Sequence, residues 1–315
     1  MATSYTAVIA TGTGVTKCSL FQSSTSPKPH LLLPRAVVSS ARVSTDVART
    51  TSPRDIVDDR QILDRRQRFV GWFHQAWPYV QVYKGSTFVV VIASEIVDDT
   101  QSFESILKDM ALLHQLGIRF VLITETCLQA EEIFEQKCRN MINSRRRYMT
   151  SEQMALEAAM EAAGRVENEI LATISPGGAP PSTLSIATGN FLAASKDGDH
   201  GEVRKIDSAG IRERLDQDSI VILSNLGYSG TGEVINCSTF EVASACALAM
   251  KADRLICVID AGASPEENEE KKQRRLSINE CLFNLSTAVS DGVEGVHFID
   301  GMVEGVLLLE LFSRV

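Results

Sequence analysis

A three-layer α/β sandwich with a mainly parallel sheet is the fold that this sequence predicts. The main indication is Ser219–Asp260, which has the pattern of a strand, a glycine-containing loop, an amphipathic helix and a second strand. Two apolar runs around one helix make a βαβ unit with parallel strands and a right-handed crossover. The same alternation recurs on both sides of this stretch, which indicates an α/β protein. A ligand site is therefore expected at the carboxyl ends of these strands, near Asn225–Cys237.

Length and composition limit the class of protein. The chain has 315 residues, of which 44% are hydrophobic, and this suffices for one large α/β domain with appendages. No apolar run approaches the roughly 20 residues that span a bilayer, so no membrane partner is expected. The net charge of −9 argues against a nucleic-acid partner. The seven cysteines lack metal-ligand spacing and are interpreted as reduced packing residues.

The first 50 residues differ from the rest in charge. They hold five basic residues and one acidic residue among many serines and threonines, which is the composition of an organelle transit peptide. An ordinary disordered tail is the alternative. We expect a transit peptide and disordered linker over residues 1–64, an N-terminal helix over residues 65–84, and the α/β domain over residues 85–315.

An aromatic segment precedes the predicted core. Phe69, Trp72, Phe73 and Trp77 recur at helical spacing, and Tyr79 follows them. A proline at position 78 is expected to end this helix. A helix that carries exposed aromatic residues either folds back on the core of its own chain or packs against another subunit.

The core elements follow in chain order from local patterns. Phe88–Ile92 and Arg119–Thr124 are apolar runs and hence buried strands, and Phe103–Leu116 between them has one apolar helical face. Helical patterns then occupy about Leu128–Lys137 and Ser151–Ile174, with Ser151 as the expected cap. The later elements are a loop at Pro176–Ser182, a strand at Gly201–Asp207, a short helix capped by Asp207 or Ser208, strands at Ser219–Leu223, Arg254–Ile259 and Gly295–Ile299, and helices at Thr239–Met250, Ser277–Ser290 and Val306–Phe312.

Motifs of common catalytic sites are missing from the sequence. There is no GxGxxG after a strand, no GxxxxGK[ST], no HExxH and no GxSxG. Glu125 with Glu131 or Glu132 suggests an acid and base pair, but solvated residues on a helix surface are the alternative. Gly227, Gly230 and Gly232 shape a loop that either presents N–H groups to an anion or is simply a turn. No catalytic residue and no metal ligand is assigned.

Several strings carry a family resemblance. They are FVGWFHQAWPYV, STFVVVIASEIV, LKDMALLHQLGIRFVLI, GEVRKID, SIVILSNLGYSGTGEVINCSTFEVASACALAMKADRLICVID and GVHFIDGMVEGVLLLELF, and they extend from about Phe69 to Phe312. Together they resemble the amino-acid-kinase-fold half of N-acetylglutamate synthase, most closely the plant chloroplast form. The resemblance implies the carbamate-kinase-like fold and a family reaction that transfers acetyl from acetyl-CoA to L-glutamate in arginine biosynthesis. It also implies L-arginine as feedback inhibitor and the plastid stroma as location, with the mitochondrion as alternative.

The related acetylglutamate kinases differ from this chain at charged positions. They place a lysine in the first strand where Val91 stands here, and an aspartate where Phe240 stands. A phosphoryl-transfer site without that cation lacks its main charge stabiliser. Kinase activity is therefore not expected.

Other departures concern the synthase reaction. The family carries its acetyltransferase domain after the kinase-fold domain, and this sequence stops at Val315, so we expect that domain and its acetyl-CoA site to be missing. No bound cofactor and no acetyltransferase activity are expected of the chain alone. In the family's substrate motif Tyr148 replaces an arginine. The resemblance leaves a vestigial acetylglutamate or anion loop, formed by Gly230, Gly232, Asn236 and Ser238.

The resemblance also implies an arginine site and an oligomer. His297 and Glu310 match a histidine and a glutamate that close the effector site in arginine-inhibited relatives, and a carboxylate can accept a guanidinium through two hydrogen bonds. A core histidine and a solvated helix glutamate are the alternative. The residues of the aromatic segment match a helix that is exchanged between dimers; they are Phe69, Trp72, Phe73, Trp77 and Tyr79.

Three hypotheses about function remain open at this point. The first is a truncated synthase polypeptide that forms a homo-oligomer and senses L-arginine. The second is a catalytically inactive regulatory subunit that binds a full-length synthase or kinase. The third is a degenerate paralogue without a ligand, which two segments that look shortened would favour.

Overall fold

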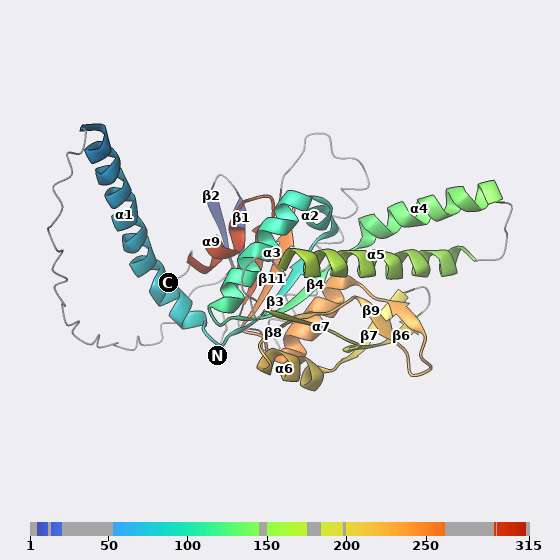
Figure 1. Ribbon diagram of the computed structural model, residues 1–315. Helices are drawn as coiled ribbons and strands as arrows, with labels where there is room; N and C mark the ends of the chain where they lie inside the picture. The colour runs from blue at the N-terminus through green and yellow to red at the C-terminus, as the bar shows by residue number, and fades with distance from the viewer. Residues whose placement is uncertain are drawn as a thin grey trace.

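The computed structural model describes residues 5–11, 14–20, 53–144, 150–174, 184–197, 200–261, 293 and 295–312. Within them, helices cover both faces of an eight-stranded sheet, and a four-stranded sheet packs beside it (Figure 1). The predicted three-layer α/β fold is confirmed. The expected loop at Pro176–Ser182 and helix at Ser277–Ser290 lie outside the described residues.

The main sheet is parallel except at one edge. Every neighbouring pair runs parallel apart from the outermost two strands, which form an antiparallel hairpin. The strand order is β2 (Gly14–Leu20), β1 (Tyr5–Thr11), β12 (Val296–Asp300), β11 (Arg254–Ile259), β3 (Thr87–Ile92), β4 (Arg119–Thr124), β8 (Ser219–Ile222) and β5 (Ser185–Thr188). The smaller sheet has the order β10 (Val234–Asn236), β9 (Leu226–Tyr228), β6 (Leu192–Asp197) and β7 (His200–Ile206).

The helices reproduce most of the predicted pattern. They are α1 (Pro53–Tyr83), α2 (Ser94–Asp98), α3 (Thr100–Gln115), α4 (Cys127–Ser144), α5 (Ser151–Ile174), α6 (Ser208–Asp216), α7 (Thr239–Met250) and α9 (Val306–Phe312). The bounds of β4, α5, α7, β11 and α9 are those the sequence predicts. The short elements α2, β5, β6, β9 and β10 were not predicted, because runs of three to six residues do not show a full helical or strand period.

Alternate residues of the central strands pack on opposite faces of the sheet. On β3, Val89 and Val91 belong to one apolar cluster with α6 and α7, whereas Phe88, Val90 and Ile92 belong to a second cluster with α3, α5 and α9. Side chains of a strand alternate between its two faces, so a strand buried on both sides must be apolar throughout. This explains the unbroken apolar run of β3.

Local hydrogen bonds set the helix ends. Asp207 caps α6, as expected, since its carboxylate accepts the Gly210 N–H over 3.1 Å. The cap of α5 is Thr150 rather than the expected Ser151. Thr150 Oγ1 accepts from Gln153 N over 3.2 Å, and Gln153 Oε1 accepts from Thr150 N over 3.3 Å, which is a capping box.

Helix α1 differs from the prediction at both ends. Pro78 lies inside the helix instead of ending it, and the helix continues to Tyr83. Proline removes one hydrogen bond from a helix interior, but Tyr83 is buried and its ring packs edge-on against Phe88 with centroids 5.7 Å apart. This tertiary contact fixes the last turn in helical form. At its start, α1 reaches back to Pro53, which lies within the predicted linker.

Residues 1–64 also contain two strands that the sequence analysis did not assign. Strand β1 pairs in parallel with β12, with Ile9 opposite Phe298, and β2 returns as its antiparallel partner. Its sequence, Tyr-Thr-Ala-Val-Ile-Ala-Thr followed by Gly, has the residue types of a strand and a turn. The strand was not assigned because the basic, serine- and threonine-rich composition of the first 50 residues was interpreted as that of a transit peptide. A disordered linker is therefore not what the structure has at β1 and β2, and the transit peptide stays a prediction.

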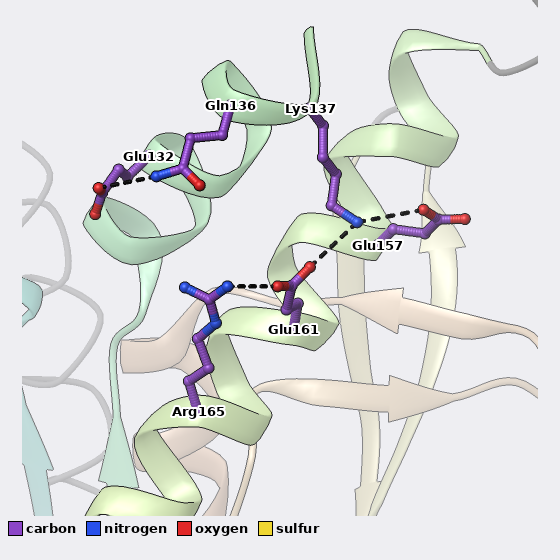
Figure 2. A network of polar contacts seen from close by, with 6 residues as sticks. All are labelled: Glu132, Gln136, Lys137, Glu157, Glu161 and Arg165. Carbon is purple, nitrogen blue, oxygen red and sulfur yellow. Dashed lines mark hydrogen bonds and ion pairs between the residues drawn. The ribbon is translucent and has the colours of Figure 1, made fainter. Parts of the chain in front are cut away.

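Helices α4 and α5 lie side by side and extend away from the sheet (Figure 1). Their shared seam is apolar and contains Ile133, Ala158 and Ala162. Above it, Lys137 lies 3.5 Å from Glu157 and 3.2 Å from Glu161, as Figure 2 shows. The Lys137 ammonium, and an arginine one turn along α5, lower the pKa of Glu161. Because exposed ion pairs contribute little to stability, the seam holds the two helices together.

An acidic depression separates α3 from the turn that joins β12 to α9. Its volume is about 490 Å³, and Asp109 and Glu304 are among its lining residues. Burial and the nearby Glu304 carboxylate raise the pKa of Asp109 to about 6, although the Leu308 N–H bonded to it acts in the opposite direction. Within the described residues, Asp109 Oδ2 is buried and has no hydrogen-bond partner. Ionisation of this carboxyl group therefore lowers the stability of the folded protein.

Asp109→Asn should change how stability depends on pH. An acid whose pKa is raised by folding binds more protons in the folded state, so the free energy of unfolding falls as pH rises through the interval from about 4 to about 6. The variant should lose this component and should be more stable than the parent at pH 7, by roughly 1–2 kcal/mol after allowance for solvent screening of this half-buried group. Urea unfolding at several pH values measures both. Glu304→Gln should weaken the slope, and an unchanged slope in Asp109→Asn would refute the assignment.

Candidate functional site

Four side chains from four elements form one hydrogen-bonded set, in which three are buried and Arg254 is half-buried. They are Tyr83 at the end of α1, Arg254 on β11, His297 on β12 and Glu310 on α9. Arg254 Nη2 donates to Tyr83 Oη over 2.6 Å, and Arg254 Nη1 lies 2.5 Å from His297 Nε2. On the other side of the imidazole, His297 Nδ1 lies 2.5 Å from Glu310 Oε1. We call these four residues the buried polar network.

Strand register brings the network together. Ile256 of β11 lies opposite His297 of β12, and Arg254 is two residues before Ile256. Residues two apart on a strand, and residues opposite each other on neighbouring strands, share one face of a sheet. This is the face that α9 covers, since Ile256 and Leu307 belong to the same apolar cluster. The sheet and α9 therefore direct these three polar side chains towards one another.

The partners assign the protonation of His297. A guanidinium carries only donors, so Arg254 donates to His297 Nε2, which must be the unprotonated nitrogen. The hydrogen is then on Nδ1, which donates to the Glu310 carboxylate. A neutral imidazole thus joins one cation to one anion. His297 is fully buried and Glu310 is 6% exposed, and buried charges of this kind need such partners.

Gly295 makes room for this arrangement. A Cβ atom on Gly295 would lie 2.8 Å from His297 Nε2, which is closer than carbon and nitrogen atoms can approach without a shift. Gly295 O also accepts the Leu255 N–H over 2.9 Å, so the backbone there is fixed by the β11 ladder. Only glycine lets the imidazole lie this close to the chain.

The structure places His297 and Glu310 in direct contact, as an effector site formed by both would require. The alternative of a solvated helix glutamate is wrong, because Glu310 is buried. The sequence analysis missed Tyr83 and Arg254. A charged residue at the start of the buried strand Arg254–Ile259 was the available signal, since such a residue needs a partner when it is enclosed.

The aromatic side chains of α1 are exposed in the single chain. The exposed fraction is 65% for Phe69, 68% for Trp72, 50% for Phe73 and 44% for Trp77, whereas Tyr79 is half-buried. The helix projects from the sheet (Figure 1). In the structure, this helix therefore does not fold back on the core of its own chain.

The glycine loop is a hairpin turn between β9 and β10. Ser229 accepts three of its N–H groups: Thr231 N and Glu233 N donate to Ser229 Oγ, and Gly232 N donates to Ser229 O. Gly232 has a φ of +86°, which this turn requires of it. Of the two interpretations of the loop, the turn accounts for these bonds. An anion would have to displace Ser229.

The other loop residues lie after this turn. Asn236 Oδ1 accepts from Asn225 Nδ2 over 2.9 Å, and Ser238 precedes α7 without a side-chain cap bond. These bonds orient Asn236 towards Asn225 at the carboxyl end of β8. Asn225–Cys237 thus lies at the expected strand ends.

The two positions at which the related acetylglutamate kinases carry charged residues are apolar in this chain. Val91 and Phe240 are buried in one apolar cluster. At the ends of β3 and β4, Glu125 Oε2 accepts the Ser94 N–H over 3.1 Å, at the first residue of α2. Glu132 is exposed on α4 and accepts from a glutamine one turn away. The alternative of solvated helix residues thus holds for Glu132.

The described residues limit two further classes of site. Among them, no group of three or more side chains has the composition and spacing of a metal site. No described helix combines the length and apolar composition needed to cross a membrane.

The sequence model of the amino acid kinase family matches residues 86–292. The chain belongs to the amino acid kinase family. Among relatives, an amino-acid acetyltransferase of Pseudomonas fluorescens (strain SBW25) is 33% identical over 274 residues, which is 78% of this chain and 63% of that protein. An amino-acid acetyltransferase of Edwardsiella ictaluri (strain 93-146) is 30% identical over 283 residues, which is 80% of this chain and 64% of that protein. This member of the family therefore spans less than two thirds of the relatives that it matches.

A solved structure agrees with these relatives. N-acetylglutamate synthase from Neisseria gonorrhoeae, complexed with coenzyme A and L-arginine, is 27% identical and superposes with a TM-score of 0.60. The match covers 78% of this chain and 63% of the synthase chain. The resemblance to N-acetylglutamate synthase is confirmed, and so is the amino-acid-kinase fold.

Gly295→Ala should destabilise the protein and disturb the buried polar network. The added methyl group must displace His297 or the backbone, and overpacking of this kind costs about 1–3 kcal/mol. Chemical denaturation measures the loss. Gly230→Ala is a matched control, because a Cβ there meets nothing within 4 Å, and it should change stability by less than about 0.5 kcal/mol. Equal stability of the two variants would show that His297 is free to move.

Proposed function

We propose that this chain is the L-arginine-sensing, kinase-fold part of an N-acetylglutamate synthase of arginine biosynthesis. The observation that carries the proposal is the pairing of the half-buried Arg254 guanidinium with the buried Glu310 carboxylate, which are joined through His297. L-arginine offers a guanidinium to a carboxylate and a carboxylate to a guanidinium, so it can satisfy both ions of this pair. The L-arginine present in the gonococcal synthase structure supports this choice of ligand.

The family reaction is assigned to the whole synthase rather than to the described residues. We propose the transfer of acetyl from acetyl-CoA to L-glutamate, which the names of the relatives and the coenzyme A in the gonococcal structure support. The relatives are longer than the region they share with this chain, and we place acetyl transfer in their additional part. The apolar Val91 and Phe240 support a domain that does not transfer phosphate.

The exposed aromatic helix favours a chain that works in an assembly. Four large aromatic rings in water on one helix are an unfavourable arrangement for an isolated subunit. Homo-oligomerisation would cover them, and so would binding to a full-length synthase, which is the regulatory-subunit alternative. We further propose a plastid location, with the mitochondrion as alternative, on the basic composition of the first 50 residues.

L-arginine should bind the chain, and Glu310→Gln should weaken that binding. Removing a charge-assisted hydrogen bond costs roughly 1.5–3 kcal/mol, which is about a ten- to a hundredfold increase in Kd. Titration calorimetry on both proteins measures the ratio. Glu233→Gln, at an exposed position on the β9–β10 hairpin, should bind like the parent. Equal affinities for all three proteins would remove Glu310 from the site, and no heat from the parent would contradict the proposal itself.

Replacing Trp72 and Phe73 by glutamate should produce a smaller species in solution. Two charges on the apolar face would oppose its burial against another subunit. Light scattering coupled to size-exclusion chromatography gives the mass of the parent and of the variant. Tyr228→Glu, a similar change at an exposed residue of β9, is the control. An unchanged mass in the helix variants would rule out assembly through α1.

A further inference from the structure

Asp109 of α3 holds the first turn of α9. Its carboxylate accepts the Leu308 N–H, which lies near the start of α9, where a helix has no partner of its own for its N–H groups. A side chain of one helix thus completes the hydrogen bonding of another. The bond attaches the start of α9 to α3 at the acidic depression.

The turn between β12 and α9 is fixed to the sheet at its beginning only. A Cβ atom on Gly301 would lie 2.7 Å from Val258 Cγ1, so the backbone there packs directly on the sheet. Asp300 Oδ1 accepts the Met302 N–H over 3.1 Å and closes the first bend. Gly305 differs from Gly301, because it has a φ of +72° and a Cβ atom on it would meet nothing within 4 Å. The second half of the turn therefore depends on α3 for its position.

The contacts between this half of the turn and α3 are weak or repulsive. Ser102 Oγ donates to Met302 Sδ over 3.8 Å, and a thioether sulfur is a weak acceptor. Glu304 adds a second carboxylate to the acidic depression. Lys108 also lines the depression, but its ammonium is paired with Glu104 over 2.6 Å in an exposed ion pair. The bond from Asp109 is therefore the main polar attachment that the described residues give to this part of the chain.

Asp109 is suited to this position in only one of its two charge states. Its Oδ2 is buried and has no hydrogen-bond partner among the described residues. Enclosing an ionised oxygen without a donor is costly, whereas a neutral acid can remain there at a smaller cost. Burial and the Glu304 carboxylate accordingly raise the pKa of Asp109 to about 6. Ionisation favours a state in which water reaches Oδ2, and the depression of about 490 Å³ has room for it.

We propose that Asp109 and Glu304 form a pH-sensitive contact between α3 and the start of α9. While Asp109 is protonated, it stays enclosed and keeps the Leu308 N–H against α3. Once it is ionised, Oδ2 takes up water, the two carboxylates repel each other, and the turn before α9 moves away from α3. The apolar side of α9 remains in the core, so the movement is confined to the first turn of the helix.

Met302 supplies a reporter inside the depression, which it lines together with Glu304. The NMR shift of its ε-methyl group should titrate in the parent with a midpoint of about 6. Asp109→Asn cannot ionise, so this transition should be absent from that variant. In Glu304→Gln the midpoint should fall, because a like charge has been removed. Met160, which is exposed on α5, is the control within the same spectra and should show no such transition.

Amide hydrogen exchange measures the movement itself. After correction for the intrinsic effect of pH, the amides of residues 306–309 should exchange about fivefold or more faster at about pH 7.5 than at about pH 5 in the parent. Asp109→Asn should lose this difference, because asparagine keeps an acceptor for the Leu308 N–H and carries no charge. The amides of α7, which packs on the other face of the sheet, should behave alike in both proteins.

Either of two results overturns the proposal. If the Met302 methyl group shows no transition at about pH 6, or shows it equally in Asp109→Asn, then Asp109 does not titrate in the depression. If the methyl group titrates while the exchange of residues 306–309 stays the same, Asp109 changes its charge without releasing the start of α9. Both measurements are made without L-arginine, so their failure would leave the proposed function untouched.

Discussion

The burial of Glu310, and its link through His297 to Arg254, is the constraint on which the candidate site depends. A carboxylate enclosed to this extent needs a hydrogen-bond partner, and here that partner is an imidazole which a half-buried guanidinium supports from the other side. The neutral imidazole of His297 satisfies both by donating at one nitrogen and accepting at the other. Each of the four residues in the network comes from a different secondary-structure element. The requirement for pairing therefore also fixes how β11, β12, α9 and the end of α1 meet.

The buried polar network lies away from the carboxyl ends of the central strands. At the carboxyl ends of the central strands, where open α/β sheets usually bind ligands, Val91 and Phe240 complete an apolar cluster and Glu125 accepts the first N–H of α2. The buried polar network instead lies around Arg254, at the beginning of its strand. The buried polar network thus lies beneath α9 rather than at these strand ends.

The sequence predicted those parts of the fold whose patterns span several turns or a whole buried strand. The 24 residues of α5 and the apolar β4 have the predicted bounds because their sequence patterns are strong. Short elements such as α2 and β9 depend on tertiary pairing and leave no such pattern. Pro78 was misread because the burial of Tyr83 outweighs one lost helical bond. His297 and Glu310 were found by resemblance, whereas Arg254 and Tyr83 were not, since their roles exist only once β11 and α1 meet.

Pairing between β1 and β12 has a consequence for the processing of the chain. Strand β1 lies in the segment with the composition of a targeting peptide, and it supplies the backbone partners on one side of β12. Cleavage after residue 20 would remove this neighbour and leave β12 as the border of the sheet, with unpaired amide and carbonyl groups on the strand that carries His297. A precursor and its mature form would then present different surfaces at this border. The uncovered strand would be open to a backbone partner from another chain.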